Sequence, residues 1–197
     1  MIKLPEPQLD GRMSLERAIH LRRSIRDFTN DTVTLTQLSQ ILWSGQGITD
    51  NKNGFRAAPS AGAVFPMQLW IHVDRVAGLT KDGLYTYDPV KNELHEVPKP
   101  ANERTLAAIC FGQNWIDTAA FSILITSTTQ KMIDKYGADC VRFLYQEAGH
   151  IAQNMELQAV AVNLAGTPIE AYKAPDIQAF LGTTQDPVYI VSFGPPK

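Results

Sequence analysis

The stretch Arg22-Arg-Ser-Ile-Arg-Asp-Phe28 carries more information about the fold and function than any other part of the chain. Arg22, Arg23, Ser24 and Arg26 place three guanidinium groups and a hydroxyl within five residues, in a protein whose formal net charge is only −2. The planar arginine fork suits phosphate oxygens, and a serine hydroxyl adds a neutral donor. A solvated basic patch that opposes a helix dipole is the alternative. The cluster alone leaves both interpretations open.

Size and composition predict one globular domain with no nucleic-acid or membrane partner. The chain has 197 residues, of which 44% are hydrophobic and 19% charged. Residues 1–13 are predicted to form an extended arm, and residues 14–197 a single domain. The near-neutral charge argues against nucleic-acid binding. No apolar run approaches the ~20 residues that a membrane helix needs, and no apolar signal core precedes residue 20, so we expect a cytoplasmic protein.

Helical and strand patterns mix without strict alternation, which favours an α+β fold over a doubly wound one. Ser14 is a predicted N-cap, and Thr34-Leu-Thr-Gln37 is a capping-box pattern. Apolar spacing then predicts helices over residues 14–23, 34–44, 102–111 and 139–164, and strands over 68–73, 83–88, 93–97, 121–127 and 187–193. Residues 56–66, rich in small side chains, are interpreted as a loop.

The helices predicted at 14–23 and 139–164 each have an apolar stripe that we expect to face the core. The first stripe is Leu15, Ala18 and Ile19, and the second is Val141, Leu144, Tyr145, Ala148, Ile151, Ala152, Met155 and Ala159. Gly149 interrupts the long helix at a cost of about 1 kcal/mol relative to alanine, which indicates a close approach to the backbone there.

No self-sufficient catalytic constellation is visible in the sequence. Neither a dinucleotide-binding fingerprint nor a P-loop occurs, and the histidines lack zinc spacing. Glu147-Ala-Gly-His150 matches half of a di-iron motif, but the second copy that such a site needs is absent, so no metal is predicted. Cys110 and Cys140 are interpreted as buried free thiols. A phosphate cradle without catalytic side chains suggests that a bound cofactor supplies the chemistry.

Five segments, in matching order, resemble the flavin-dependent nitroreductase family. The basic stretch resembles the R-R-S-x-R-x-F signature that opens these proteins, and the other four resemble the branch of SagB and thiazoline-oxidase-type dehydrogenases or the family's long helix. These four are Ala58-Pro-Ser-Ala-Gly-Ala-Val-Phe-Pro66, Gly83-Leu-Tyr-Thr-Tyr-Asp-Pro89, Phe111-Gly-Gln-Asn-Trp-Ile116, and Glu147-Ala-Gly-His-Ile-Ala-Gln-Asn154 with Gly166-Thr-Pro-Ile-Glu170. The resemblance implies a nitroreductase-like α+β fold, with a central, mainly antiparallel sheet flanked by helices. It also implies an intertwined homodimer with FMN at the interface.

The resemblance also assigns roles to individual residues. Arg22, Ser24 and Arg26, with Arg23 beside them, would contact the flavin phosphate, ribityl chain or pyrimidine edge. The partner subunit would contribute the residues that lie against the ring: Pro59, Ser60, Ala61 and Gly62. Gln113 would lie near the polar edge of the ring. Pro168, Ile169 and Glu170 would cover its other side, with a backbone N–H near Glu170 directed at N5. Lys197 would reach the phosphate.

Each of these assignments has a plainer alternative. The alternatives are a tight turn for the loop over 59–63, a helix-end residue bonded to backbone for Gln113, and a connecting loop for 168–170. Lys197, as a terminal residue, is mobile by default.

The implied activity is ping-pong hydride transfer, from NADH or NADPH through flavin N5 to a nitroaromatic, quinone or similar acceptor. No catalytic side chain is assigned, because the flavin carries the chemistry. One alternative is an azoline (thiazoline or oxazoline) peptide dehydrogenase that uses an additional Lys/Tyr pair, and Lys135 and Tyr136 are adjacent in this chain. The other is a non-catalytic flavin-binding protein.

Overall fold

A seven-stranded antiparallel sheet forms the centre of the molecule, in the order β1-β6-β5-β4-β7-β9-β8. The structure is a computed structural model that describes residues 1–98, 100 and 104–197. The strands of this sheet are β1 (Ile2–Lys3), β4 (Met67–Val73), β5 (Leu84–Asp88), β6 (Glu93–Val97), β7 (Phe121–Ser127), β8 (Ala165–Ile169) and β9 (Asp186–Gly194). A separate hairpin joins β2 (Ile48–Asp50) to β3 (Phe55–Arg56).

The middle of the sheet is formed by β7, which pairs along its length with both β4 and β9. Every residue of β7 is buried, including Ser122, Thr126 and Ser127, as expected for a largely apolar strand that is covered on both faces. The predicted hairpin over 83–97 is confirmed as the pair β5 and β6.

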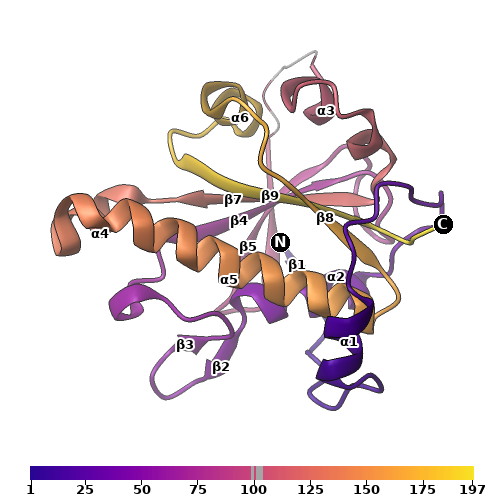
Figure 1. The fold of residues 1–197 in the computed structure, drawn as a ribbon, viewed down its shortest axis with the longest axis horizontal. Coiled ribbons are helices and arrows are strands. Elements are labelled where there is room, and N and C mark those ends of the chain that lie inside the picture. Colours follow the sequence, from indigo (N-terminus) through magenta and orange to yellow (C-terminus); the bar gives the residue numbers. More distant parts are fainter. Residues whose placement is uncertain (99, 101–103) are drawn as a thin grey trace.

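Helices cover both faces of the sheet. They are α1 (Leu15–Leu21), α2 (Leu35–Gln46), α3 (Leu106–Ile109), α4 (Thr129–Tyr136), α5 (Cys140–Ala161) and α6 (Ala174–Leu181). On one face α2 and α5 pack on the sheet in one apolar cluster, and on the other α3 and α6 form a second. The longest helix, α5, crosses in front of the sheet, with α4 near one of its ends and α1 near the other (Figure 1).

The helix starts predicted from side-chain caps are confirmed. The Ser14 side chain accepts a hydrogen bond from the Arg17 backbone, and Thr34 forms a complete capping box with Gln37. The helix predicted over 102–111 is confirmed only as the short α3, and residues 102 and 103 lie outside the described part. The predicted arm contributes the edge strand β1, and Leu4 enters the main core.

Two expected apolar stripes are only partly buried. Ala18 packs inward, but Leu15 and Ile19 are 62% and 55% exposed. On α5, Val141 and Tyr145 are exposed although the rest of the stripe is buried. Helical periodicity marks an apolar face but does not say what covers it, and in the described part of the chain these positions stay half or more exposed. A side chain at Gly149 would also meet no atom within 4 Å, so the expected close approach is not seen.

None of the helices in the described part of the chain is long and apolar enough to cross a membrane.

Candidate cofactor site

The basic stretch leaves α1 in an extended conformation and is held against the end of the sheet. The Thr167 hydroxyl on β8 donates to the Ile25 carbonyl, and the Thr29 backbone N–H donates to the Pro195 carbonyl at 2.9 Å. The Lys197 N–H donates to Asp27 O at 3.1 Å, so the C-terminal residues run beside the stretch (Figure 1). These contacts place the cluster where β8 and β9 meet.

The members of the cluster have different surroundings. Arg22 is half-buried, and its Nη1 lies 3.6 Å from Oε1 of Glu156 on α5. Arg26 lies with its guanidinium carbon 5.7 Å from the centroid of the Trp115 ring, and Ser24 is exposed. Arg23 instead folds back and donates to the carbonyls of His20 and Arg22, so it has the helix-terminal role that the alternative interpretation describes.

Lys197 does not point freely into solvent. Its Nζ lies 2.6 Å from Oδ1 of Asp27, within the basic stretch. The terminal lysine is therefore beside the cluster, as the resemblance implies, but it is paired with an acid there.

A cavity of about 550 Å³ lies between α5 and the part of the sheet formed by β8 and β9. Its walls come from α5, from the segment after β8 and from β9; they are Tyr145, Ala148, Gly149, Glu170, Tyr172, Ala174, Pro187, Val188 and Tyr189. The Tyr189 hydroxyl donates to Oε1 of Glu170 at 3.4 Å. Burial raises the pKa of Tyr172 to about 12, and burial together with the Glu170 charge raises that of Tyr189, so both phenols stay neutral at physiological pH.

Pro168 and Ile169 belong to strand β8, so the interpretation of this segment as a connecting loop is wrong for these two residues. Ile169 is buried, and exposed Glu170 follows directly after the strand. Gln113 donates from Nε2 to the Cys110 carbonyl at 3.0 Å and to the Ala171 carbonyl at 3.4 Å. It therefore does bond to backbone, and it ties its loop to the residue next to Glu170.

The loop over 59–63 is a strained turn held from beneath by α4. Gly62 has a φ of 58°, and a Cβ there would collide with the Tyr136 hydroxyl and the Lys135 ammonium group. Lys135 donates from Nζ to the Gly62 carbonyl at 3.0 Å. The Ser60 hydroxyl accepts from the Phe65 backbone N–H at 2.9 Å. Only glycine fits the conformation at 62 without steric strain.

A single chain does not bring all the predicted site residues together. The cluster contacts α5 at Glu156, whereas Ser60 lies near Glu147 on the same helix. Nine helical residues span about 13 Å, so the loop over 59–62 and the cluster lie at separate places along α5. The cluster, Gln113 and 168–170 share one region, and the loop stands apart from it.

Sequence reasoning missed the two buried carboxylates on α5. Glu147 is 2% exposed and Glu156 is 6% exposed. Both are flanked by residues of the buried stripe, Ala148 and Met155, and a charged residue next to such a stripe is the signal that could have marked them. In the sequence Glu147 stood out only as half of a metal motif and as the first residue of a family-like segment, not as a buried acid.

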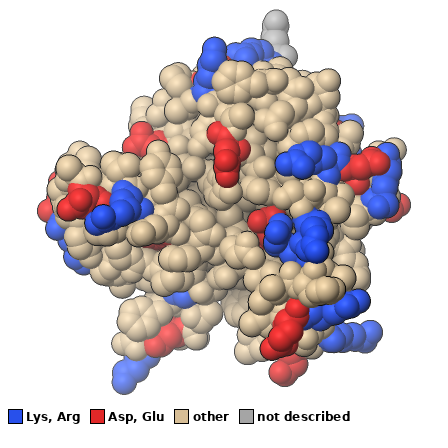
Figure 2. Space-filling model, viewed as in Figure 1, with Lys and Arg blue, Asp and Glu red and all other residues tan. Residues whose placement is uncertain are grey.

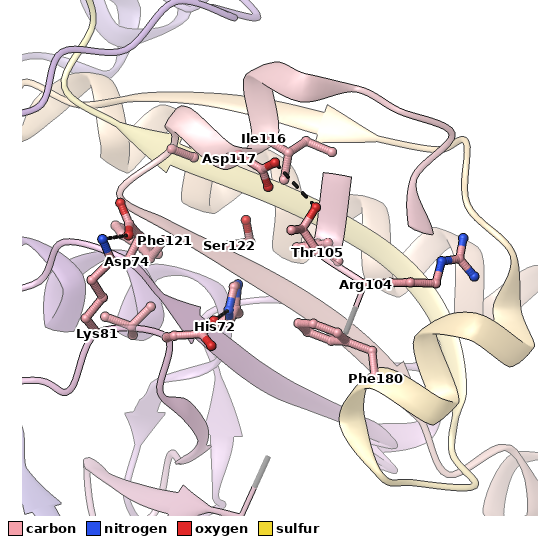
Figure 3. Close-up of a pocket in the computed structure, with 14 residues that line it drawn as sticks. His72, Asp74, Lys81, Arg104, Thr105, Ile116, Asp117, Phe121, Ser122 and Phe180 are labelled. Atoms are coloured by element: carbon pink, nitrogen blue, oxygen red, sulfur yellow. Dashed lines mark hydrogen bonds and ion pairs between the residues drawn. The ribbon is translucent and has the colours of Figure 1, made fainter. Parts of the chain in front are cut away.

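Another cavity, of about 440 Å³, lies on the opposite face of the sheet, against α3 and α6 (Figure 3). Its polar walls are built from pairs: His72 Nε2 lies 2.8 Å from Asp82 Oδ1, and the Thr105 hydroxyl donates to Asp117 at 3.3 Å. Since none of the predicted cofactor-binding residues lines it, this cavity is separate from the candidate site.

Comparisons with known proteins identify the family of this chain. The Nitroreductase family model matches residues 19–195, and the chain belongs to the nitroreductase family. A protein of Methanocaldococcus jannaschii whose name assigns it to the nitroreductases is 29% identical over 193 residues, which cover 98% of this chain and 95% of that protein. The chain is thus a nitroreductase-family oxidoreductase with the family's α+β fold.

Two solved structures show the same fold. A nitroreductase-type protein of Ralstonia eutropha superposes with a TM-score of 0.86 at 24% identity, over 100% of this chain and 89% of that one. A chain of the E. coli microcin synthetase McbBCD complex, solved with truncated pro-MccB17 bound, gives a TM-score of 0.75 at 18% identity. That match covers 96% of this chain and 75% of the other.

Proposed function

We propose that this chain binds FMN as a homodimer and transfers electrons from NADH or NADPH to a small aromatic acceptor such as a nitroaromatic or quinone. When bound, FMN supplies the redox chemistry by accepting a hydride and passing on its two electrons. Two observations on one strand carry the proposal. The basic stretch is bonded to β8 through Thr167 and Ile25, and Glu170, directly after β8, lines a cavity of about 550 Å³ with aromatic and small walls. FMN has a phosphate at one end, which suits the basic stretch, and a flat ring at the other, which suits the cavity.

The residues present fit this cofactor. Arg22 and Arg26, with the Ser24 hydroxyl, offer charged and neutral donors for a phosphate. Gly149 and Ala148 leave space at the wall formed by α5, where a larger side chain would fill the cavity. Gln113 is held against the segment after Glu170 and is thereby kept beside the cavity. In this arrangement the protein binds, orients and excludes water, and it needs no side chain of its own as an acid or base.

A second copy of the chain would complete the site. The loop over 59–62 lies apart from the cluster within one chain, so a partner's loop is needed if both are to contact one ligand. Exposed apolar side chains on α1 and α5, namely Leu15, Ile19, Leu21, Val141 and Tyr145, are the surface we assign to the contact. Figure 2 shows a broad uncharged area on the face crossed by α5, with a few acidic and basic side chains near its centre and more at its margins.

Anaerobic mixing of the FMN-loaded protein with NADH or NADPH tests the proposal. We expect bleaching of the yellow flavin absorbance by at least one nicotinamide, and recovery when a quinone or nitroaromatic is added. Initial rates should then give parallel double-reciprocal lines, as a ping-pong scheme requires. Intersecting lines would reject that scheme, and a yellow protein that neither nicotinamide bleaches would indicate a non-catalytic flavin-binding protein.

A second candidate function, azoline peptide oxidation, is favoured by the contact between α4 and the loop. Lys135 and Tyr136 are adjacent to Gly62, in the segment that would face the partner's flavin. The structural match to a complex with a bound peptide supports the same reading. Turnover of a thiazoline-containing peptide with oxygen, together with failure to oxidise NADH or NADPH, would establish it over the first candidate.

A further inference from the structure

We propose that Glu156 is a positioning residue, a buried carboxylate on α5 that holds the Arg22 guanidinium of the basic stretch in place for an anionic ligand. This inference rests on the proposed function, because it concerns how the same site binds its anionic ligand. It adds a residue to that site that does not belong to the basic stretch.

Glu156 is confined on two sides. Its side chain is 7% exposed, and its Oε1 lies 3.6 Å from Arg22 Nη1. A Cβ at Gly166 on β8 would lie 3.2 Å from Glu156 Cγ, so the absent side chain at 166 leaves the room that the glutamate occupies. The carboxylate therefore points from the helix toward the end of the basic stretch.

A charge at this position is hard to explain by stability alone. Burial raises the pKa of Glu156, and the charge of Arg22 acts against that shift. Oε1 is buried and has no hydrogen-bond partner among the described residues. A buried, under-satisfied carboxylate destabilises a fold, and an apolar residue on this helix would avoid that cost. What the carboxylate provides is a fixed counter-charge for Arg22.

The other cations in and beside the cluster are held differently. Arg23 bonds to backbone carbonyls, Arg26 lies over the Trp115 ring, and Lys197 pairs with the exposed Asp27. Arg22 is paired with a buried acid from another element, and that restricts a long side chain that would otherwise sample many rotamers. A ligand that binds Arg22 then has less ordering to impose, which is the general advantage of pre-organisation.

Glu156 also connects the cluster to the cavity. Its charge contributes to the raised pKa of Tyr189, and Tyr189 bonds Glu170 across the cavity wall. Glu156 therefore acts electrostatically on two groups, Arg22 in the basic stretch and Tyr189 in the cavity wall.

A double-mutant cycle tests the inference. The wild type, Glu156→Gln, Arg22→Gln and the double variant are titrated with FMN and, separately, with inorganic pyrophosphate. We expect Glu156→Gln to weaken FMN binding about tenfold, the size of one lost charge-assisted contact. In the Arg22→Gln background the same change should have less than about a twofold effect, because the residue it positions is gone.

Four outcomes separate this inference from the proposed function. Equal FMN affinity of Glu156→Gln and wild type, or full additivity in the double variant, would overturn the inference while the flavin site stands. A third outcome is that the protein does not bind FMN, but binds pyrophosphate with non-additive effects of the Glu156 and Arg22 substitutions. This result would overturn the proposed function and keep the inference. Absence of both kinds of binding would overturn both.

Glu156→Asp is the second variant, because it keeps the charge but moves it one methylene farther from Arg22. We expect its FMN affinity to lie between those of the wild type and Glu156→Gln. If neither Glu156 variant folds, the carboxylate is structural and the inference is wrong.

Discussion

At the scale of single residues, Glu147 is the strongest example of a group whose chemistry the fold changes. Burial raises its pKa to about 7, although the Ser60 hydroxyl and the Arg56 charge both favour the ionised form. Neither carboxylate oxygen has a hydrogen-bond partner of ordinary geometry within the described ranges. The Ser60 hydroxyl therefore favours the carboxylate, but it forms no hydrogen bond of ordinary geometry with either oxygen. Glu147 is partly protonated at neutral pH.

The stability of the protein should fall as the pH rises from about 5 to 8. Because the pKa of Glu147 is higher in the folded state, the folded chain binds more protons between its unfolded value near 4.5 and about 7. The contribution of Glu147 to the free energy of unfolding is fully present below about pH 4.5 and is lost as the pH rises through 7. The full shift corresponds to about 3 kcal/mol. The free energy of unfolding, measured with urea at several pH values, should fall with rising pH in the wild type and fall less steeply in Glu147→Gln.

Glu96→Gln, at an exposed position of β6, is the matched control for that measurement. If it flattens the slope as much as Glu147→Gln does, the buried carboxyl is not the cause.

Gly62 is the residue at which backbone conformation matters most for the site. Gly62→Ala places a Cβ at φ 58° against Lys135 and Tyr136, at a cost of about 1–2 kcal/mol. We expect a Tm lower by about 3–6 °C and weaker FMN binding. Gly11→Ala is the control, because nothing lies within 4 Å and its φ is not positive. Equal behaviour of the two variants would contradict the role given to the loop.

At the scale of elements, the sequence predicts what is encoded within a few residues. Caps at Ser14 and Thr34 and the apolar run of β7 gave correct elements because their signals are local. Strand β8 was missed because it contains a glycine and a proline and shows no alternation. It exists because five of its residues pair with β9, and a partner 20 or more residues away leaves no local pattern.

The capping box of α2 should contribute measurably to stability. Thr34→Ala removes the acceptor for the Gln37 backbone N–H and should cost about 1 kcal/mol, or a Tm lower by about 2–4 °C. Thr36→Ala, exposed in the same first turn, is the control and should be nearly neutral. Thermal unfolding by circular dichroism measures both, and a loss in Thr36→Ala as large as in Thr34→Ala would count against the cap.

At the scale of the whole molecule, the fold was predicted through the resemblance and not through summed local signals. Composition and periodicity indicated α+β but not the order of the strands. The candidate site was inferred in the same way and stays a prediction. In the single chain Ile25 of the basic stretch contacts Thr167 and Gln113 contacts Ala171, while the loop over 59–62 stands apart. The role of Glu156 was out of reach, because its neighbour Arg22 is 134 residues away and no spacing rule connects them.

The exposed face of α1 and α5 predicts a dimer in solution. Sedimentation equilibrium should give about 44 kDa, twice the chain mass of 21.8 kDa. Ile19→Asp places a charge on that face and should shift the protein toward monomer with loss of FMN. Val90→Asp, at an exposed turn of the β5–β6 hairpin, is the control and should remain dimeric. A monomeric wild type that still binds FMN would contradict the shared site.

A parallel titration with FMN and riboflavin shows whether the basic stretch holds the phosphate of a bound flavin. The two ligands differ only in the phosphate, so binding of the ring is common to both. We predict that FMN binds at least about 100-fold more tightly than riboflavin, as expected for two charge-assisted contacts. Arg26→Gln should reduce this difference between the two affinities. Equal affinities for FMN and riboflavin, or no binding of either, would contradict the account.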